Sequence, residues 1–263
     1  MIPSFLMMLA CTTTVPVAPD SSEIDNRTQI MAVDRDLASA EETATLVKKE
    51  GGDCVAFEAD VTKGVTLDAA IQAAHKRWGR IDIMHYNVGV SLGGGDTTLE
   101  NFTEEIFDRI NAINLRGAIM ACKYVIPIMQ QQRSGAISMI SSLAALEDYP
   151  TIGYKVSKAA MIAFCKQVAI QNAEFGIRAN VILPGLMDTP MAVETRAQRS
   201  GKSRAEVAAE RAARCPLRHE QGTAWDVANV ALFLDSDEAK YVTGVDILVD
   251  GGRALLVAGY GRM

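Results

Sequence analysis

Glycine is missing from the first 50 residues of this 263-residue chain, and the first of its 20 glycines is Gly51. A turn that brings the backbone close to a phosphate group usually depends on glycine. The amino-terminal region therefore lacks the ordinary means of building a phosphate-binding turn.

Clusters of cysteine and histidine are missing as well. The three histidines lie far apart in the sequence, and the cysteines are scattered, odd in number and never spaced as Cys-x-x-Cys. They are Cys11, Cys54, Cys122, Cys165 and Cys215. This pattern argues against a disulfide framework or a zinc site and favours a reducing compartment, so we expect a cytoplasmic protein with no bound metal.

An excess of basic residues and a long apolar run are also absent. The net charge is -6, so nothing indicates binding to nucleic acid. No run approaches the roughly 20 apolar residues of a membrane span. The apolar stretch 5–11 has no Lys or Arg before it and is as short as the shortest signal cores, so a secretion or lipoprotein signal is the less favoured interpretation.

Short apolar runs alternate with helical patterns from residue 28 onward. We predict strands at 29–33, 54–58, 81–88, 136–140, 179–183 and 245–249, and helices at 36–50, 65–78, 104–131, 154–174 and 224–236. This alternation is typical of βαβ units, and it predicts one α/β domain over 1–263: a Rossmann-like, doubly wound parallel sheet with helices on both faces. The polar, Arg-rich segment 189–218 interrupts the rhythm where a lid over a substrate would lie.

Tyr154 and Lys158 are four residues apart in a predicted helix and so share one face of it. A cation beside a phenol favours the phenolate and lowers the tyrosine pKa, which would let Tyr154 exchange a proton with an alcohol oxygen near neutral pH. Ser142, at the end of a predicted buried strand, can donate a hydrogen bond to the same oxygen. A Tyr-x-x-x-Lys spacing alone is weak, because a core tyrosine beside a solvated lysine gives the same pattern.

Further motifs in the same order give this spacing its meaning. They are Asn87-Val88-Gly89, Asn114-Leu115-Arg116-Gly117, the run 180–189 containing Pro184-Gly185 and Thr189, Val242-Thr243-Gly244, and Val249-Asp250-Gly251-Gly252. Together with Ser142, Tyr154 and Lys158 they resemble the short-chain dehydrogenase/reductase family, from about residue 28 to residue 252.

The resemblance implies an NAD(P)-dependent oxidoreductase that moves a hydride between the nicotinamide and a secondary alcohol or ketone. It implies a catalytic tetrad of Asn114, Ser142, Tyr154 and Lys158. Tyr154 would be the general acid/base, Ser142 would orient the substrate oxygen, Lys158 would lower the tyrosine pKa and hold the nicotinamide ribose, and Asn114 would anchor a water that relays protons.

The resemblance also implies a set of cofactor-binding positions. They are Asp34, Asp60, Val61, Asn87, Gly89, Tyr154, Lys158, Pro184, Gly185 and Thr189. Asp34 follows a predicted strand, where a carboxylate can accept hydrogen bonds from both ribose hydroxyls and would repel a 2′-phosphate. We therefore expect NAD rather than NADP, although the neighbouring Arg35 partly offsets that repulsion.

The family pattern fails at the amino terminus. Counting back from Asp34, the glycine-rich turn of the family, Thr-Gly-x-x-x-Gly-x-Gly, should lie near residues 10–17, and residues 1–27 carry nothing like it. Pro16 and Pro19 stand where the first turns of the following helix belong, and interior prolines cost a helix about 3 kcal/mol each. We therefore expect a disrupted first βα unit, in which residues 5–10 can still form the central strand.

Three explanations remain open at this point: a misread frame or wrong start joined to a genuine dehydrogenase, a degenerate family member, or an unfamiliar structure that binds the pyrophosphate in another way. The alternative function is a catalytically silent relative that serves as a binding or assembly subunit. In either case the resemblance implies a homo-oligomer, a tetramer or a dimer, built on the helix that begins near Gly117 and on the helix 154–174.

A local basic patch is the one clue to the substrate. In an acidic chain, residues 196–218 hold Arg196, Arg199, Lys202, Arg204, Arg211, Arg214 and Arg218 against Glu206 and Glu210. Such a patch can attract an anionic substrate, although a solvated helix face is the more common explanation.

Overall fold

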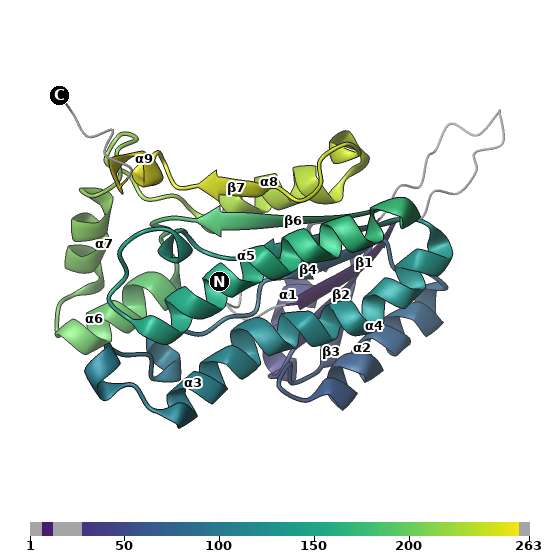
Figure 1. The fold of residues 1–263 in the computed structure, drawn as a ribbon, viewed down its shortest axis with the longest axis horizontal. Helices are drawn as coiled ribbons and strands as arrows, with labels where there is room; N and C mark the ends of the chain where they lie inside the picture. The colour runs from purple at the N-terminus through teal and green to yellow at the C-terminus, as the bar shows by residue number, and fades with distance from the viewer. Residues whose placement is uncertain (1–6, 13–27, 258–263) are drawn as a thin grey trace.

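Seven strands form one sheet in the order β3-β2-β1-β4-β5-β6-β7 in the computed structural model, which describes residues 7–12 and 28–257 (Figure 1). The strands are β1 Met7–Thr12, β2 Thr28–Asp34, β3 Asp53–Glu58, β4 Ile83–Tyr86, β5 Gly135–Ile140, β6 Ile177–Pro184 and β7 Asp246–Val249. This strand order is that of a Rossmann-like α/β fold, in which ligands bind beside the strand where the order reverses. The predicted fold class is confirmed.

Helices cover both faces of this sheet. They are α1 Leu37–Lys49, α2 Gly64–Trp78, α3 Glu104–Asn111, α4 Gly117–Gln132, α5 Ile152–Asn172, α6 Thr195–Ser200, α7 Arg204–Ala212, α8 Ala224–Asp235 and α9 Arg253–Val257. The main apolar core lies under α2, α4 and α5, whereas α1 and α8 pack against the opposite face (Figure 1). The predicted strands and long helices lie close to where the sequence places them, except that the helix predicted at 104–131 is divided into α3 and α4. Apolar runs mark the buried strands and one buried face marks each helix, so the sequence carries a clear pattern.

The central strand β1 differs from the expectation of a fully parallel sheet. It lies between β2 and β4 but runs antiparallel to both, so that Met7 pairs with Val33 and with Tyr86, and Thr12 pairs with Thr28. Parallel neighbours need a crossover of a dozen or more residues, usually a helix, whereas antiparallel neighbours do not. The sheet is therefore mixed.

The face opposite the main core carries two separate apolar clusters. One lies under α1 around Ala32 and Cys54, and the other lies under α8 around Ile182. Between them a polar group is buried: His85 Nδ1 lies 2.7 Å from Ser138 Oγ, which donates to Asp235 Oδ2 at 2.8 Å. Burial lowers the pKa of His85 to about 4 and raises that of Asp235 to about 7. Among the described residues no helix follows β1 to join the two clusters.

One described helical stretch, Glu104–Gln132, is long and apolar enough to cross a membrane by length and composition alone. Its α4 part packs into the main core through Ala118, Ala121, Cys122, Val125 and Met129. This stretch is therefore a core helix of the fold.

The placement of β1 can be tested through Leu9, which is fully buried in the main core. Leu9→Ala should lower the free energy of unfolding by about 2 to 5 kcal/mol, because it deletes buried methyl groups and leaves a cavity. Leu99→Ala is the matched control, since Leu99 is 70% exposed and its loss should change stability by no more than about 0.5 kcal/mol. Denaturant titration measures both variants, and equal effects would show that β1 does not occupy the centre of the sheet.

Candidate active site

The loops that carry the predicted catalytic residues leave the sheet at one edge. Strands β4, β5, β6 and β7 are parallel, and their registers bring Tyr86 beside Met139, Ile140 beside Ile182, and Pro184 beside Val249. The carboxyl ends of these strands therefore meet at the same edge, and the loops that follow them face one another there. Helices α6 and α7 lie beyond this edge, at the left of Figure 1.

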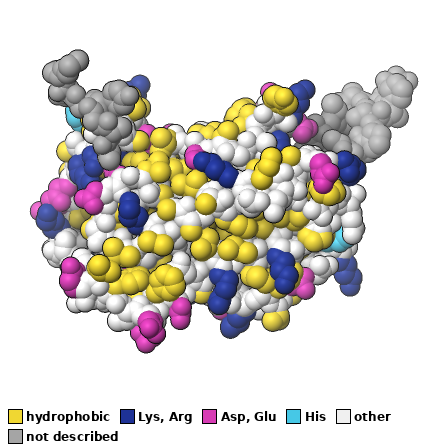
Figure 2. All heavy atoms as spheres, in the orientation of Figure 1, with side chains coloured by type: hydrophobic (Ala, Val, Ile, Leu, Met, Phe, Trp, Pro, Cys, Tyr) yellow, Lys and Arg dark blue, Asp and Glu magenta, His cyan; other side chains and the backbone are white. Residues whose placement is uncertain are grey.

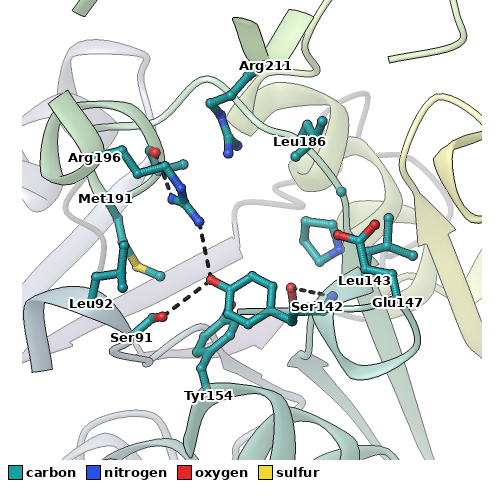
Figure 3. Close-up of a pocket in the computed structure, with 15 residues that line it drawn as sticks. Ser91, Leu92, Ser142, Leu143, Glu147, Tyr154, Leu186, Met191, Arg196 and Arg211 are labelled. Atoms are coloured by element: carbon teal, nitrogen blue, oxygen red, sulfur yellow. Dashed lines mark hydrogen bonds between the residues drawn. The ribbon is translucent and has the colours of Figure 1, made fainter. Parts of the chain in front are cut away.

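Ser142 and Tyr154 lie in one cavity of about 90 Å³ at this edge (Figure 3). Pro184 and Gly185, from the end of β6, line the same cavity, and the side chains of Tyr149, Arg196 and Arg211 also line it. The Tyr154 and Tyr149 rings are 5.5 Å apart between centroids. Ser142 Oγ accepts from the Ala144 backbone N–H at 3.2 Å, which fixes the hydroxyl at the start of a short 3-10 turn. Two predicted catalytic residues thus share one cavity.

Lys158 lies behind Tyr154, on the same face of α5. Its Nζ is 5.7 Å from the centre of the Tyr154 ring and donates to the Ile140 carbonyl at 2.7 Å. Burial lowers the pKa of Lys158 to about 7. Burial also raises the pKa of Tyr154 to about 12, against an opposing hydrogen bond with Ser142. The expected lowering of the tyrosine pKa by Lys158 is therefore not found in this structure, because both groups are buried and burial dominates.

Asn114 sits in a π-helical turn, Ala112–Arg116, that separates α3 from α4. The sequence predicts one continuous helix here; such π turns interrupt helices most often at functional sites. The Asn114 side chain is fully buried: its Oδ1 accepts from Val90 N–H at 2.7 Å, and its Nδ2 donates to Val90 O and to Ser157 Oγ, both at 2.9 Å. Asn114 thus ties the loop after β4 to α5, beside Lys158.

Asp96 is a buried residue of the site that sequence reasoning missed. Its carboxylate accepts from Thr151 Oγ1 at 2.5 Å and from the backbone N–H groups of Gly153 and Tyr154 at 2.9 and 2.8 Å. These N–H groups belong to the first turn of α5, where the helix itself supplies no carbonyl oxygen to accept their hydrogen bonds. Asp96 therefore fixes where α5 begins and so where Tyr154 stands. Its sequence neighbours, a run of glycines and threonines, give no sign of this contact.

The positions expected at the adenosine end follow strands β2, β3 and β4. Asp34 ends β2 with 4% of its surface exposed, its Oδ1 accepts from Asp36 N–H at 3.0 Å, and burial raises its pKa. Asp60 and Val61 follow β3, and Asp60 Oδ1 accepts from both the N–H and the hydroxyl of Thr62. Asn87 follows β4 and is half-buried.

Gly89, expected with Asn87 near the adenosine ribose and the central strand, also follows β4, and the positions expected at the nicotinamide end follow β6. Gly89 packs so closely against Lys158 that a Cβ at this position would lie 3.0 Å from Nζ. Pro184 and Gly185 line the cavity. Thr189 lies outside the cavity lining and accepts from Ala192 N–H at 3.3 Å, where the π-helical turn Pro190–Glu194 begins.

The described residues thus fit a dinucleotide at its two ends, and they do not fit it in the middle. In the family the pyrophosphate lies against a glycine-rich turn and a helix amino terminus that follow the first strand. Here β1 is reversed, so that Met7 and not Thr12 lies at the carboxyl edge beside Val33 and Tyr86. Within the parts of the chain that the structure describes, neither a glycine nor a helix amino terminus follows β1 at that edge.

Asp96→Asn tests the anchoring of α5. An amide has one acceptor oxygen where the carboxylate has two, so part of the cap is lost and the free energy of unfolding should fall by about 1 to 3 kcal/mol. Asp108→Asn, at an exposed position on α3, is the matched control and should be near neutral. Chemical denaturation compares the two, and a neutral Asp96→Asn variant would contradict the cap.

Comparison with known proteins places this site in a family. A protein-family profile described as enoyl-(acyl carrier protein) reductase matches residues 25–254. The 2-(R)-hydroxypropyl-CoM dehydrogenase of Xanthobacter autotrophicus is 34% identical over 225 residues, which are 85% of this chain and 87% of that protein.

Solved structures agree with this placement. A short-chain dehydrogenase/reductase from Burkholderia xenovorans is 38% identical, with a TM-score of 0.76 over 85% of this chain and 83% of that one. ElxO with NADP bound is 26% identical, with a TM-score of 0.75 over 85% of this chain and 87% of that one. The fold, the motifs and these matches agree: the chain belongs to the short-chain dehydrogenase/reductase family of NAD(P)-dependent oxidoreductases.

Proposed function

We propose that this chain transfers a hydride between NAD and a secondary alcohol or ketone, with Tyr154 as the general acid/base. The observation that carries the proposal is the shared cavity of Ser142 and Tyr154 with Lys158 directly behind the tyrosine. The bound cofactor supplies or accepts the hydride, and the chain's own residues bind the substrate oxygen and move its proton.

Tyr154 and Ser142 act on the substrate oxygen from one side of the cavity. The raised pKa of Tyr154, about 12, keeps the phenol protonated at neutral pH in the protein without cofactor. A protonated phenol can give its proton to the oxygen of a ketone as that oxygen becomes an alkoxide. The Ser142 hydroxyl can donate a hydrogen bond to the same oxygen and stabilise its negative charge.

Lys158 and Asn114 serve the proton transfer from behind. Because the pKa of Lys158 is near 7, its ammonium can lose and regain a proton at working pH. We propose that Lys158 replaces the proton that Tyr154 gives up and holds the nicotinamide ribose. Asn114, fixed to Val90 and Ser157, shapes the buried space where a relay water would lie.

Asp34 supports a preference for NAD over NADP. Its carboxylate stands at the end of β2, where an acidic group can accept hydrogen bonds from the adenine ribose and repel a 2′-phosphate. Asp60 and Val61, with Asn87 and Gly89, would complete the adenosine side. Pro184, Gly185 and Thr189 would complete the nicotinamide side.

Residues 189–218 are proposed as the substrate lid of a single domain. This segment holds α6 and α7, which lie beyond the carboxyl edge of the sheet (Figure 1). Its Arg196 and Arg211 line the cavity that holds Tyr154. A lid there would exclude water while the proton moves.

Exposed apolar side chains support a homo-oligomer, a dimer or a tetramer. Phe107, Ile119 and Val156 are 47%, 38% and 47% exposed on the face formed by α3, α4 and α5, where Figure 2 shows hydrophobic side chains gathered. Trp225 and Leu232 on α8 are 68% and 71% exposed. Contiguous exposed apolar surface of this kind marks protein interfaces.

The buried free thiols Cys54, Cys122, Cys165 and Cys215 agree with a cytoplasmic location.

The second candidate function is a binding or assembly subunit that has lost catalysis. The observation that favours it is the reversed β1, beside which the described residues place no glycine-rich turn at the carboxyl edge. Such a subunit would keep the fold and its interfaces and would not turn over any substrate with NADH.

Tyr154→Phe separates the two functions. In an oxidoreductase the substitution removes the proton donor and should lower kcat at least about 100-fold, with NADH binding retained. Tyr241→Phe is the matched control, since Tyr241 is fully exposed. Steady-state oxidation of NADH with a panel of ketones measures the effect, and unchanged turnover in Tyr154→Phe would refute the assigned role.

A further inference from the structure

Two arginines face the cavity in which the reaction would take place. Arg196 comes from α6 and Arg211 from α7, and both line the cavity together with Ser142 and Tyr154. Figure 3 shows their guanidinium groups pointing into the cavity from the side opposite Tyr154. The lid segment therefore presents two positive charges to whatever occupies this space.

The hydrogen bonds of these two guanidinium groups go to neutral partners. Arg196 donates to the Ala192 carbonyl at 2.8 Å and to the Tyr149 hydroxyl at 3.3 Å. Arg211 donates to Gln221 Oε1 at 2.7 Å and to the Met187 carbonyl at 3.2 Å. A guanidinium has five N–H donors, so each side chain keeps donors for a further acceptor.

The carboxylates nearby pair with other cations. Glu147 also lines the cavity, but its Oε2 lies 3.2 Å from Arg253. Asp188 and Glu194 lie 2.7 and 3.9 Å from Arg204. Among the described residues no carboxylate oxygen lies within 4.0 Å of the Arg196 or Arg211 nitrogens.

Burial makes this unbalanced charge costly. Arg211 is only 7% exposed, and burial together with the repulsion from Arg196 lowers its pKa to about 10. A charge held away from water is normally paired, because desolvation is otherwise uncompensated. An anion placed between the two guanidinium groups would supply that pairing.

A second, larger cavity of about 390 Å³ adjoins the first and shares Leu92, Arg196 and Arg211 with it. Its other lining residues include Arg199, Lys202 and Arg214, of which Lys202 pairs with Glu210 at 2.5 Å. The two arginines therefore stand between an outer basic space and the inner cavity of Tyr154. Basic walls of this kind raise the local concentration of anions and steer them inward.

We propose that Arg196 and Arg211 bind an oxyanion group of the substrate, so that the substrate is a small hydroxy or oxo compound carrying a carboxylate or a phosphate. The inference rests on the proposed function, because it places the anionic end of the substrate opposite the oxygen that Tyr154 and Ser142 would bind. Of the seven basic residues of the patch, these two are the ones that reach the reaction cavity.

The test begins with binding in the absence of cofactor. Acetoacetate and dihydroxyacetone phosphate are the anionic probes, and methyl acetoacetate is the matched neutral probe. Calorimetric titration of the full chain should show at least one anionic probe binding about tenfold or more tightly than the neutral one. Arg196→Gln and Arg211→Gln should each weaken that probe about tenfold, as expected for the loss of a hydrogen bond to a charged group, and should leave the neutral probe unchanged.

Matched variants control for charge and folding. Arg77→Gln, at an exposed position on α2, removes the same charge elsewhere and should bind like the wild type. Arg196→Lys keeps the charge and should retain part of the affinity. Arg211 also ties α7 to Gln221 and Met187, so circular dichroism checks that the Arg211→Gln variant is folded. If that variant does not fold, the test rests on Arg196→Gln.

The outcomes separate this inference from the proposed function. Arginine-dependent binding of an anionic probe supports the inference. If no probe is reduced with NADH, that failure counts against the proposed function and leaves the inference standing. Turnover of neutral and anionic ketones with equal KM, changed equally by Arg196→Gln, would overturn the inference and leave the function intact. Failure of both anionic probes to bind more tightly than methyl acetoacetate would also overturn it.

Discussion

The parallel alignment of β4, β5 and β6 is the constraint on which the rest of the site depends. Their registers set three strand ends at one edge of the sheet, so that the loops carrying Gly89, Ser142 and Gly185 meet there. The buried carboxylate of Asp96 then fixes the first turn of α5 against this edge. Tyr154 and Lys158 are one turn apart on that helix, and Tyr154 lines a cavity that Arg196 and Arg211, from α6 and α7, also line.

Much of this arrangement could be predicted from the sequence. Short apolar runs locate the strands, and the spacing of Ser142, Tyr154 and Lys158 places three side chains at one edge. The π-helical turn at Asn114 and the Asp96 cap could not be predicted, because both depend on contacts between segments far apart in the chain. In the protein without cofactor burial raises the pKa of Tyr154 to about 12, a shift that helix spacing could not predict because it says nothing about how deeply Tyr154 and Lys158 are buried.

The arginines of residues 196–218 are a further case in which the sequence alone is not enough. The sequence shows a basic patch and leaves open which of its members face solvent. Only the packing of α6 and α7 over the sheet edge distinguishes Arg196 and Arg211 from the rest. The direction of β1 is a further case: the missing glycines predict a disrupted first βα unit, but a strand of apolar residues can pair in either direction.

The described structure therefore joins a well-formed reaction site to an unusual central strand. The residues proposed for the two ends of the cofactor and for the proton transfer follow the carboxyl ends of the parallel strands or lie on α5 and the π-helical turn before α4, and the family match begins at residue 25, beyond the region of β1. The reversed β1 keeps the sheet continuous and the main core filled through Met7 and Leu9. A continuous core and a pyrophosphate-binding turn are thus separate properties. The chain retains the continuous core, and its described residues lack the glycine-rich turn that usually binds the pyrophosphate.

Calorimetric titration of the purified 263-residue chain with NADH, with NADPH as the comparison, shows whether the chain binds a nicotinamide dinucleotide. We expect micromolar binding of NADH that is tighter than binding of NADPH, because Asp34 favours the free ribose hydroxyls. A folded chain that binds neither nucleotide would contradict the account and favour the silent subunit, and tighter binding of NADPH would contradict the role given to Asp34.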